Sequence, residues 1–394
     1  MTLLQVVSPL IGLITYPYVI RVLGSSNYGL YVYSLSIVSL MSILISYGFS
    51  WTGLRDIARN QNNQNEKNRV ISTILISKLL LFGIVFIIFY LSTLFISFFK
   101  LNRLILFFCF LQVTIPDILF PIWFFQGIQK MKVVTFIQLF IKLLTIPLVF
   151  IFIKKSDDTH IYPMIISSCA IFGALIATWF MLFQEKIRIH LVSFNEIRAN
   201  FRDSFPFFCT SIVGVAKREI LPIIIGSFLS KSDVALYDLA NKIVSIPTLL
   251  TEKINGALFP EIIKNPIKSR IRKIMKMEIV IGSIIILCII LGGYWLVLLM
   301  GGKQMIMAYP LACILSITVL SHLLSGSCMN LVFIPNKKYY YITQLQVVAL
   351  ASVIILCIPI LFWQSVFIVV IAATLSGVSE VGYSFYRIKT QRLL

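Results

Sequence analysis

The chain has 394 residues, 59% of them hydrophobic and only 12% charged, with a mean hydropathy of +0.94. This composition excludes a soluble globular protein, which needs more polar surface than these residues supply, and it predicts an all-α integral membrane protein. The formal net charge is +19, but most basic residues lie in alternate loops, so the charge reflects membrane topology and does not indicate nucleic-acid binding.

The predicted elements are about twelve transmembrane helices. A helix needs about 20 apolar residues to cross the hydrocarbon layer, and stretches of that kind recur along the whole chain. In chain order they are Leu3–Ile20, Leu30–Phe49, Ile71–Phe95, Leu104–Phe125, Val133–Ile153, Ile161–Phe183, Phe205–Leu229, Ala235–Phe259, Ile279–Met300, Ile306–Phe333, Tyr340–Phe362 and Val366–Tyr386.

The distribution of positive charge between the loops predicts the orientation. Loops that stay in the cytoplasm carry an excess of Lys and Arg. The loops after the even-numbered helices, together with the C-terminal tail, hold 21 basic residues, and the loops after the odd-numbered helices hold 7. We therefore expect both termini to lie in the cytoplasm.

The chain also contains an internal repeat. With a shift of 206 residues, Leu23–Tyr31 aligns with Leu229–Tyr237, and Ile37–Ser39 aligns with Ile243–Ser245. Two sets of six helices have the same orientation in the membrane, because six is even, which predicts a parallel repeat about a pseudo-two-fold axis. We expect one six-helix bundle over residues 1–203, with a cytoplasmic linker at 184–203 interpreted as a plain surface loop, and a second bundle over 204–394.

Several segments resemble a known family. These are Tyr16–Tyr31, Tyr47-Gly48-Phe49, Arg55-Asp56-Ile57-Ala58, Pro121–Met131, Ala240-Asn241-Lys242-Ile243 and Leu258-Phe259-Pro260. Together they look like the bacterial oligosaccharide flippases, often called Wzx or O-antigen transporters. The last third of the chain matches that family only in the number and spacing of its helices.

The resemblance implies a MATE-like fold of the MOP superfamily, in which two six-helix bundles form a V around a central cavity. It implies a transporter, not an enzyme, in the bacterial inner membrane. The implied substrate is an undecaprenyl-pyrophosphate-linked oligosaccharide for O-antigen lipopolysaccharide, capsule or exopolysaccharide. The implied movement is from the cytoplasmic to the outer leaflet by alternating access, coupled to an ion gradient. Further implied partners are membrane lipids, a polysaccharide polymerase and a chain-length regulator.

Basic residues inside the predicted helices are candidates for a cationic cavity. A charged side chain in mid-bilayer costs at least about 2.5–3.5 kcal/mol, so it faces water or another charge. Lys and Arg are suited to the pyrophosphate and acidic sugars of such a substrate. The candidates are Lys217, Arg218, Lys78, Lys142, Lys242 and, at the outer mouth, Arg21. The alternative reading is that these side chains snorkel to an interface or lock helices together.

Acidic residues and one histidine are candidates for coupling transport to a proton or cation gradient. A carboxyl group in a dry helix bundle has a raised pKa, which allows it to load and release a proton. The candidates are Asp117, Glu219, Asp238, Glu380 and His322. Asp117 is expected at the depth of Lys78 and Lys142 and could pair with either, and Asp238 is spaced to pair with Lys242. For His322 the alternative is a packed, hydrogen-bonded residue.

Two other function classes remain open. A multidrug antiporter shares the architecture but favours acidic cavity residues for cationic drugs. A membrane polymerase or glycosyltransferase usually has a large or acidic outer loop, whereas the first outer loop, Arg21–Asn27, has no acidic residue. The sequence has no phosphate-binding loop and no H-E-x-x-H or G-x-S-x-G motif, and its seven cysteines are isolated. We therefore expect no cofactor and no metal site.

The orientation is testable by cysteine labelling. A single cysteine introduced in the Gln61–Asn68 loop should react with a membrane-impermeant maleimide only in inside-out vesicles, because this loop belongs to the basic, cytoplasmic set. Labelling in intact cells would contradict the predicted orientation.

Overall fold

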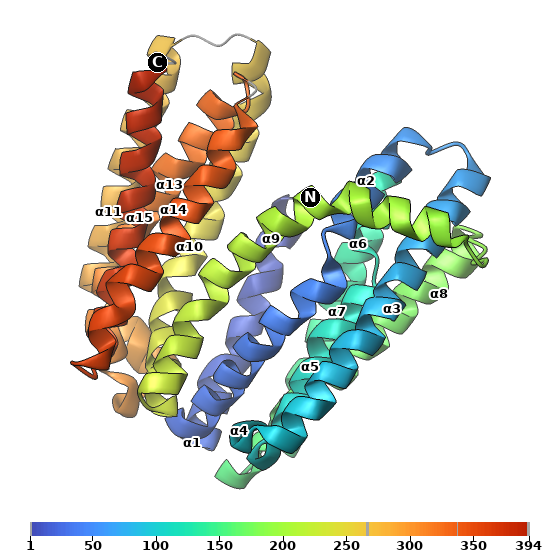
Figure 1. The fold of residues 1–394 in the computed structure, drawn as a ribbon. Helices are drawn as coiled ribbons and strands as arrows, with labels where there is room; N and C mark the ends of the chain where they lie inside the picture. The colour runs from blue at the N-terminus through green and yellow to red at the C-terminus, as the bar shows by residue number, and fades with distance from the viewer. Residues whose placement is uncertain (1, 265–267, 337, 392–394) are drawn as a thin grey trace. The chain divides into compact units, whose positions relative to one another are not determined.

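The computed structural model describes the backbone of residues 2–264, 268–336 and 338–391, and the side chains of 14–248, 269–336, 338 and 340–391. Over these residues the regular structure is entirely helical (Figure 1).

The first half of the chain contains short helices and three, α1, α3 and α9, that are much longer than the about 20 residues of one membrane crossing. Its α-helices are α1 (Thr2–Ser46), α2 (Phe49–Arg59), α3 (Gln64–Phe95), α4 (Ser97–Leu101), α5 (Arg103–Leu119), α6 (Ile122–Gly127), α7 (Met131–Phe152), α8 (Ile161–Trp179) and α9 (Phe194–Phe228). Short 3₁₀ and π turns at Ser156–His160 and Phe180–Gln184 flank α8.

The second half of the chain also consists of helices joined by short connections. Its helices are α10 (Lys231–Lys264), α11 (Lys268–Gly301), α12 (Ala308–Leu315), α13 (Ile317–Ser327), α14 (Tyr339–Cys357) and α15 (Val366–Thr390). Turns at Lys303–Met305, Cys328–Phe333 and Ile358–Leu361 extend or connect them.

Nine helical stretches in the described part of the chain are long and apolar enough to cross a membrane. Helix α9 has 35 residues, but charged residues interrupt its apolar run and it is not among the nine. Helix α10 has 34 residues, of which those after Thr248 lie outside the described side chains. The first two predicted spans form one helix in the structure, α1. The count of twelve therefore stays a prediction, while the prediction of an all-helical, multi-pass membrane protein is confirmed.

Gly24 divides α1. Its φ of 80° lies in the left-handed region, which glycine adopts without strain. The predicted outer turn Arg21–Asn27 is therefore a kink at one residue, with helical backbone on both sides.

The chain forms two compact units that do not coincide with its sequence halves. Unit 1 comprises residues 1–23 and 34–215, and unit 2 comprises 24–33 and 216–394. In unit 1, α8 packs against α5 and α7, and α2 packs against α6 and α3. The buried core there is aromatic-rich and includes Phe49, Trp123, Phe124 and Phe125. The predicted division at 203/204 stays a prediction.

Unit 2 has its own core. Helix α15 packs against α14 and α13, and α13 also packs against α10 and α11. At one end of this unit, Ile271, Cys328, Phe333 and Leu345 are buried together. Each unit therefore has an independent hydrophobic core that positions its polar residues.

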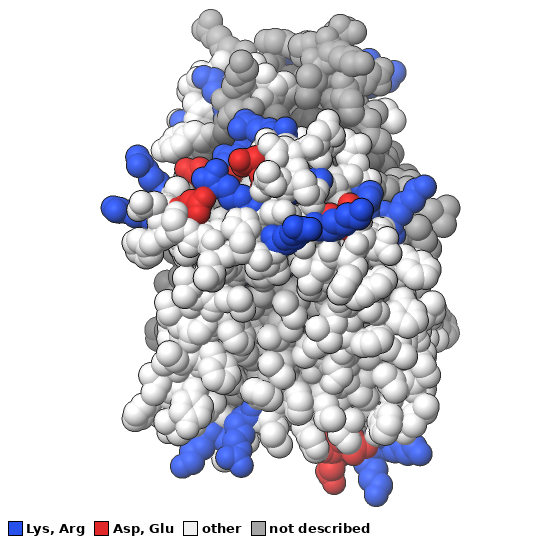
Figure 2. All heavy atoms as spheres, turned by 90° about the vertical axis from the view of Figure 1, so that its right-hand side faces the viewer, with Lys and Arg blue, Asp and Glu red and all other residues white. Residues whose placement is uncertain are grey.

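Helix α3 shows the two-sided pattern of a lipid-facing helix. Leu80, Ile84, Ile87 and Leu91 recur at helical spacing and are all exposed. The opposite side, with Lys78, Val85 and Phe89, is buried. Figure 2 shows charged side chains, most of them basic, in a belt near one end of the molecule, a broad zone without them, and a smaller group near the other end. Apolar exposure in the zone between charged ends is the pattern expected of a surface in contact with lipid.

The segment before α9 binds along α3 through a regular ladder. Gln64 Nε2 donates to the carbonyl oxygens of Glu185 and Lys186, the Arg188 backbone N–H donates to Asn68 Oδ1, and the His190 N–H donates to Ser72 Oγ. Gln64, Asn68 and Ser72 follow one another at intervals of four residues, which is a rise of about 6 Å along a helix. Their partners in the segment follow at intervals of two residues, which is about 6.6 Å in an extended chain, so each helix residue lies opposite its partner. The interpretation of Gln184–Asp203 as a plain surface loop is therefore wrong: the segment is docked, and α9 begins at Phe194.

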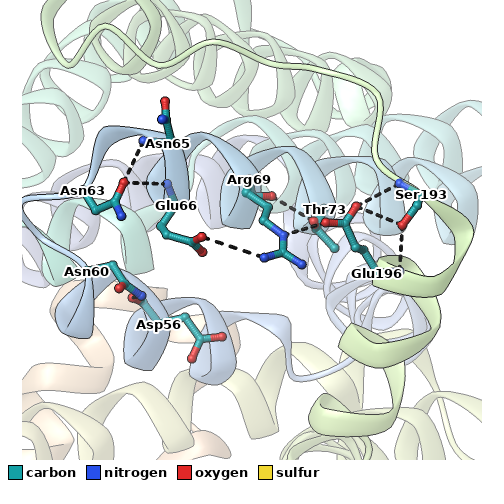
Figure 3. A network of polar contacts seen from close by, with 9 residues as sticks. All are labelled: Asp56, Asn60, Asn63, Asn65, Glu66, Arg69, Thr73, Ser193 and Glu196. Carbon is teal, nitrogen blue, oxygen red and sulfur yellow. Dashed lines mark hydrogen bonds and ion pairs between the residues drawn. The ribbon is translucent and has the colours of Figure 1, made fainter.

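An ion pair closes this ladder at the start of α9. Arg69 Nε lies 2.5 Å from Glu196 Oε1, and a second carboxylate, Glu66, lies 3.8 Å from Arg69 Nη1 (Figure 3). The Ser193 backbone N–H, and next the Arg69 guanidinium, lower the pKa of the Glu196 carboxyl. Asn63 caps α3 by accepting from the N–H groups of Asn65 and Glu66.

Packing in unit 1 predicts that alanine substitutions at two glycines, Gly53 and Gly83, have different effects on stability. A Cβ at Gly53 would lie 2.6 Å from the Trp123 ring and 2.7 Å from Ile74, whereas a Cβ at Gly83 meets nothing within 4 Å. Gly53→Ala should lower the free energy of unfolding by about 1–3 kcal/mol through overpacking. Gly83→Ala should be neutral or stabilising. Thermal unfolding of the purified variants checks both, and equal melting temperatures would contradict this packing.

Candidate functional site

Unit 1 contains a cavity of ≈ 430 Å³ between five helices and the start of α2. Its walls are partly aromatic and apolar, with Phe120, Ile122 and Trp123 among them. Its polar lining comes from Ser50, Lys78, Asp117, Gln138 and Lys142. A concave, mostly apolar site with a few convergent polar groups is the usual form of a small-molecule site.

Lys78 and Asp117 form a buried ion pair at this cavity. Lys78 is 1% exposed, and its Nζ donates to Asp117 Oδ2 at 2.9 Å and to the Asp117 carbonyl oxygen at 2.6 Å. Asp117 stands in the last turn of α5, where backbone carbonyls lack helical partners and a cation is favoured. The structure thus pairs Asp117 with Lys78, one of the two lysines between which the sequence left the choice open.

Lys142 and Gln138 line the cavity from α7. They are one turn apart on this helix, and both are half-buried. The sequence analysis named Lys142 but missed Gln138 and Ser50. The i,i+4 spacing of Gln138 and Lys142 was the signal that could have found the glutamine.

In unit 2, Lys217 of α9 forms an ion pair with Glu380 of α15. Glu380 is only 6% exposed and Lys217 is 22% exposed. The structure therefore joins a candidate for substrate binding to a candidate for ion coupling, although 163 residues separate them. The neighbouring Arg218 is different: it is 68% exposed, and its Nε lies 2.9 Å from Glu219 Oε1.

A second charged cluster in unit 2 contains Lys242, Asp238 and Tyr28. Lys242 pairs with Asp238 one turn earlier on α10. Tyr28 donates its hydroxyl hydrogen to Asp238 Oδ2 at 2.9 Å, and Lys242 Nζ donates to the same hydroxyl oxygen at 3.0 Å. Tyr28 is buried and was not among the sequence candidates. It ties the segment Gly24–Tyr33 to α10.

Two sequence candidates lie outside these clusters. Arg21 and His322 are both exposed. A residue that the sequence analysis missed is Glu278 of α11, which is 2% exposed, with Ser327 Oγ at 2.7 and 2.6 Å from its two carboxylate oxygens. It was missed because it lies just outside the predicted helix Ile279–Met300, and charged residues are common in loops.

Among the described residues, several basic candidates stand next to a carboxylate: Lys78, Lys217, Arg218 and Lys242. The Lys78–Asp117 and Lys217–Glu380 pairs are largely buried. A buried pair is tolerated where an isolated charge is not, so each carboxylate stabilises its lysine.

Comparison with known proteins identifies the family. The model of the polysaccharide biosynthesis protein family matches residues 1–266. The chain belongs to this family. A protein of Escherichia coli strain K12 named "Putative O-antigen transporter" is 27% identical over 298 residues, which cover 75% of this chain and 71% of that protein. A Shigella dysenteriae protein of the same name is 26% identical over 253 residues, covering 64% and 63%.

The fold of this family member is similar to solved transporters. The lipid II flippase MurJ in an inward closed conformation superposes with a TM-score of 0.77 and 12% identity, covering 98% of this chain and 87% of that one. An inward-facing multidrug resistance MATE transporter of the MOP superfamily gives 0.63 and 13%, covering 98% and 99%. The predicted resemblance to the flippase family and the MATE-like membrane transporter fold are confirmed. A transporter fold agrees with the expectation that the chain is not an enzyme.

The Lys78–Asp117 pair predicts a specific pattern of stability. Asp117→Asn removes the anion opposite a fully buried cation and should cost about 3 kcal/mol or more, because the remaining charge is uncompensated. The double variant Lys78→Met/Asp117→Asn should recover most of that loss. Unfolding of the purified protein measures both, with Asp157→Asn on the exposed Ser156–His160 turn as the control. A double variant no more stable than Asp117→Asn would contradict the pairing.

Proposed function

We propose that this protein is a flippase that moves undecaprenyl-pyrophosphate-linked oligosaccharide units from the cytoplasmic to the outer leaflet of the inner membrane. The observation that supports this most is the match to the polysaccharide biosynthesis family over residues 1–266, together with relatives named for O-antigen transport. The units supply O-antigen, capsule or another surface polysaccharide.

The chemistry of such a substrate requires a polar path. A pyrophosphate and a chain of sugar hydroxyls cannot cross hydrocarbon without replacing their hydration. Lysines and arginines on membrane helices supply charge-assisted hydrogen bonds to phosphate oxygens. Lys217 and Arg218 on α9 are adjacent in sequence, and both stand next to a carboxylate in the structure. We assign them to the pyrophosphate.

The acidic partners give a mechanism for release and reloading. When pyrophosphate approaches Lys217, it competes with Glu380 for the same ammonium group. The return of Lys217 to Glu380 displaces the pyrophosphate and restores the ion pair after the substrate leaves. Asp238 has the same relation to Lys242.

A multidrug antiporter is the second candidate, supported by the likeness to MATE transporters. Lipophilic cations are bound by carboxylates that are free to face them. In this structure Asp117, Asp238 and Glu380 each face a lysine, which favours an anionic substrate instead.

Replacement of the two cations tests the proposal. Arg218→Gln is the sharper variant, because Arg218 is mostly exposed and its loss should leave folding intact. We expect Lys217→Gln and Arg218→Gln to reduce surface polysaccharide by about tenfold or more, since one charged hydrogen bond contributes about 1.5–3 kcal/mol. Lys217→Arg should keep much of the activity. The measurement is surface polysaccharide in cells deleted for the native gene, normalised to protein abundance in the membrane.

A double variant separates transport from folding. Lys217→Gln leaves Glu380 buried without its partner, so we expect the abundance of this variant to fall for a structural reason as well. Lys217→Gln/Glu380→Gln is neutral and should restore abundance without restoring export. Normal export by both single Gln variants would refute the cationic site. Normal export by the double variant would show that the pair only holds α9 and α15 together.

A further inference from the structure

The docked linker, residues 184–203, has an uneven pattern of ion pairs. Each of its acidic residues contacts a basic residue elsewhere in unit 1: Glu185 contacts Lys130, Glu196 contacts Arg69 and Asp203 contacts Arg55. Its lysine and arginines are all exposed and form no ion pair with the described residues: Lys186, Arg188, Arg198 and Arg202. The linker therefore exposes four cations that the described carboxylates do not neutralise.

The docked linker also exposes large apolar side chains. Leu191 is 95% exposed and Phe194 is 76% exposed. The docking fixes which side faces outward, because the backbone N–H groups of Arg188 and His190 donate to α3 and Ile187 is buried against unit 1. The linker is thus a fixed surface on which apolar and cationic side chains are exposed together. Surfaces of this kind bind at the interface of a lipid bilayer.

The docked linker lies at the level expected of lipid headgroups. Its partners on α3 are Gln64, Asn68 and Ser72. The exposed apolar side of α3 begins about 11 Å further along the helix, at Leu79. At the end of α8, shortly before the linker, Trp179 is exposed, and tryptophan is enriched where the bilayer meets water. The linker is therefore adjacent to the lipid-facing surface, on the side of the aqueous loops.

We infer that the docked linker binds anionic phospholipid, with headgroup phosphates at Arg188 and Arg198 and acyl chains against Leu191 and Phe194. Guanidinium groups form paired hydrogen bonds with phosphate, and the apolar contact adds a second contribution that does not depend on charge. The level of the linker favours lipid over a protein partner. The inference goes beyond the proposed flippase function and does not rest on it.

Lipid binding to the purified full-length chain tests the inference. Native mass spectrometry measures the affinity for phosphatidylglycerol, which is anionic, and for phosphatidylcholine, which is zwitterionic. We expect Arg188→Gln/Arg198→Gln to weaken phosphatidylglycerol binding about tenfold, since each cation near an anionic lipid changes the affinity several-fold. Phosphatidylcholine binding should fall less. Inorganic phosphate should not displace either lipid, because it has no acyl chain.

Matched variants separate the two contributions. Lys154→Gln/Lys155→Gln removes two exposed cations after the C-terminal end of α7, so the net charge falls equally, and this variant should bind phosphatidylglycerol like the original protein. Leu191→Ser/Phe194→Ser should weaken both lipids. Equal losses in the lysine and arginine variants, no loss in the arginine variant, or displacement of lipid by phosphate would each overturn the inference.

A probe at position 194 distinguishes lipid from other occupants. Phe194 is replaced by trifluoromethylphenylalanine, and the fluorine NMR signal is recorded in lipid nanodiscs. A nitroxide on the acyl chain close to the headgroup should broaden this signal more than a water-soluble gadolinium chelate does. The opposite order would show that the linker faces water, which overturns lipid binding and leaves a protein partner as the occupant.

Discussion

The structure depends on one constraint: a charge inside an apolar helix bundle needs an opposite charge next to it. Lys78 is buried to 1% exposure and is held by two oxygens of Asp117, and Lys217 is held by Glu380. Each of these pairs joins helices that are distant in sequence, α3 with α5 and α9 with α15. These ion pairs therefore help to fix which helices are neighbours, and a structural role for the two lysines is compatible with the function proposed for them.

Pairing also explains how these lysines remain stable inside the helix bundles when no ligand is bound. Unpaired lysines in a low-dielectric cavity would bind an anion tightly but would cost several kcal/mol in its absence. A carboxylate partner removes that cost and makes binding an exchange of one anion for another. Under the proposed flippase function, the affinity then depends on the difference between the two anions.

The features that could be predicted from the sequence are those that depend on residues close together in the chain. Long apolar runs predict membrane helices, and the Asp238–Lys242 spacing predicts an ion pair, because both follow from the geometry of one helix. The Lys217–Glu380 pair could not be predicted, since no local pattern says that α9 and α15 are neighbours. The same holds for Gln138, whose place in the lining of the cavity depends on how α5, α6 and α7 pack. The docked linker was missed because its ladder uses Gln64, Asn68 and Ser72, polar residues whose face of α3 is identified only by what packs there.

The compact units differ from the sequence halves for a packing reason that the repeat alone does not reveal. The two repeat-related turns pack against each other: Ser25 Oγ lies 2.7 Å from Ser232 Oγ, and a Cβ on Gly29 would lie 1.7 Å from the Lys231 carbonyl oxygen. Gly226 likewise leaves room for the Tyr33 ring, over which the Lys231 ammonium lies at 3.4 Å from the centroid. These contacts assign Gly24–Tyr33 to unit 2, while the helical residues on either side of it belong to unit 1. The repeat aligns Gly29 with Ala235, so both positions have small side chains where backbones approach closely, and a larger residue at Gly29 would force α1 away from α10. A repeat in sequence therefore marks where two segments meet, and it does not by itself mark where one packed unit ends.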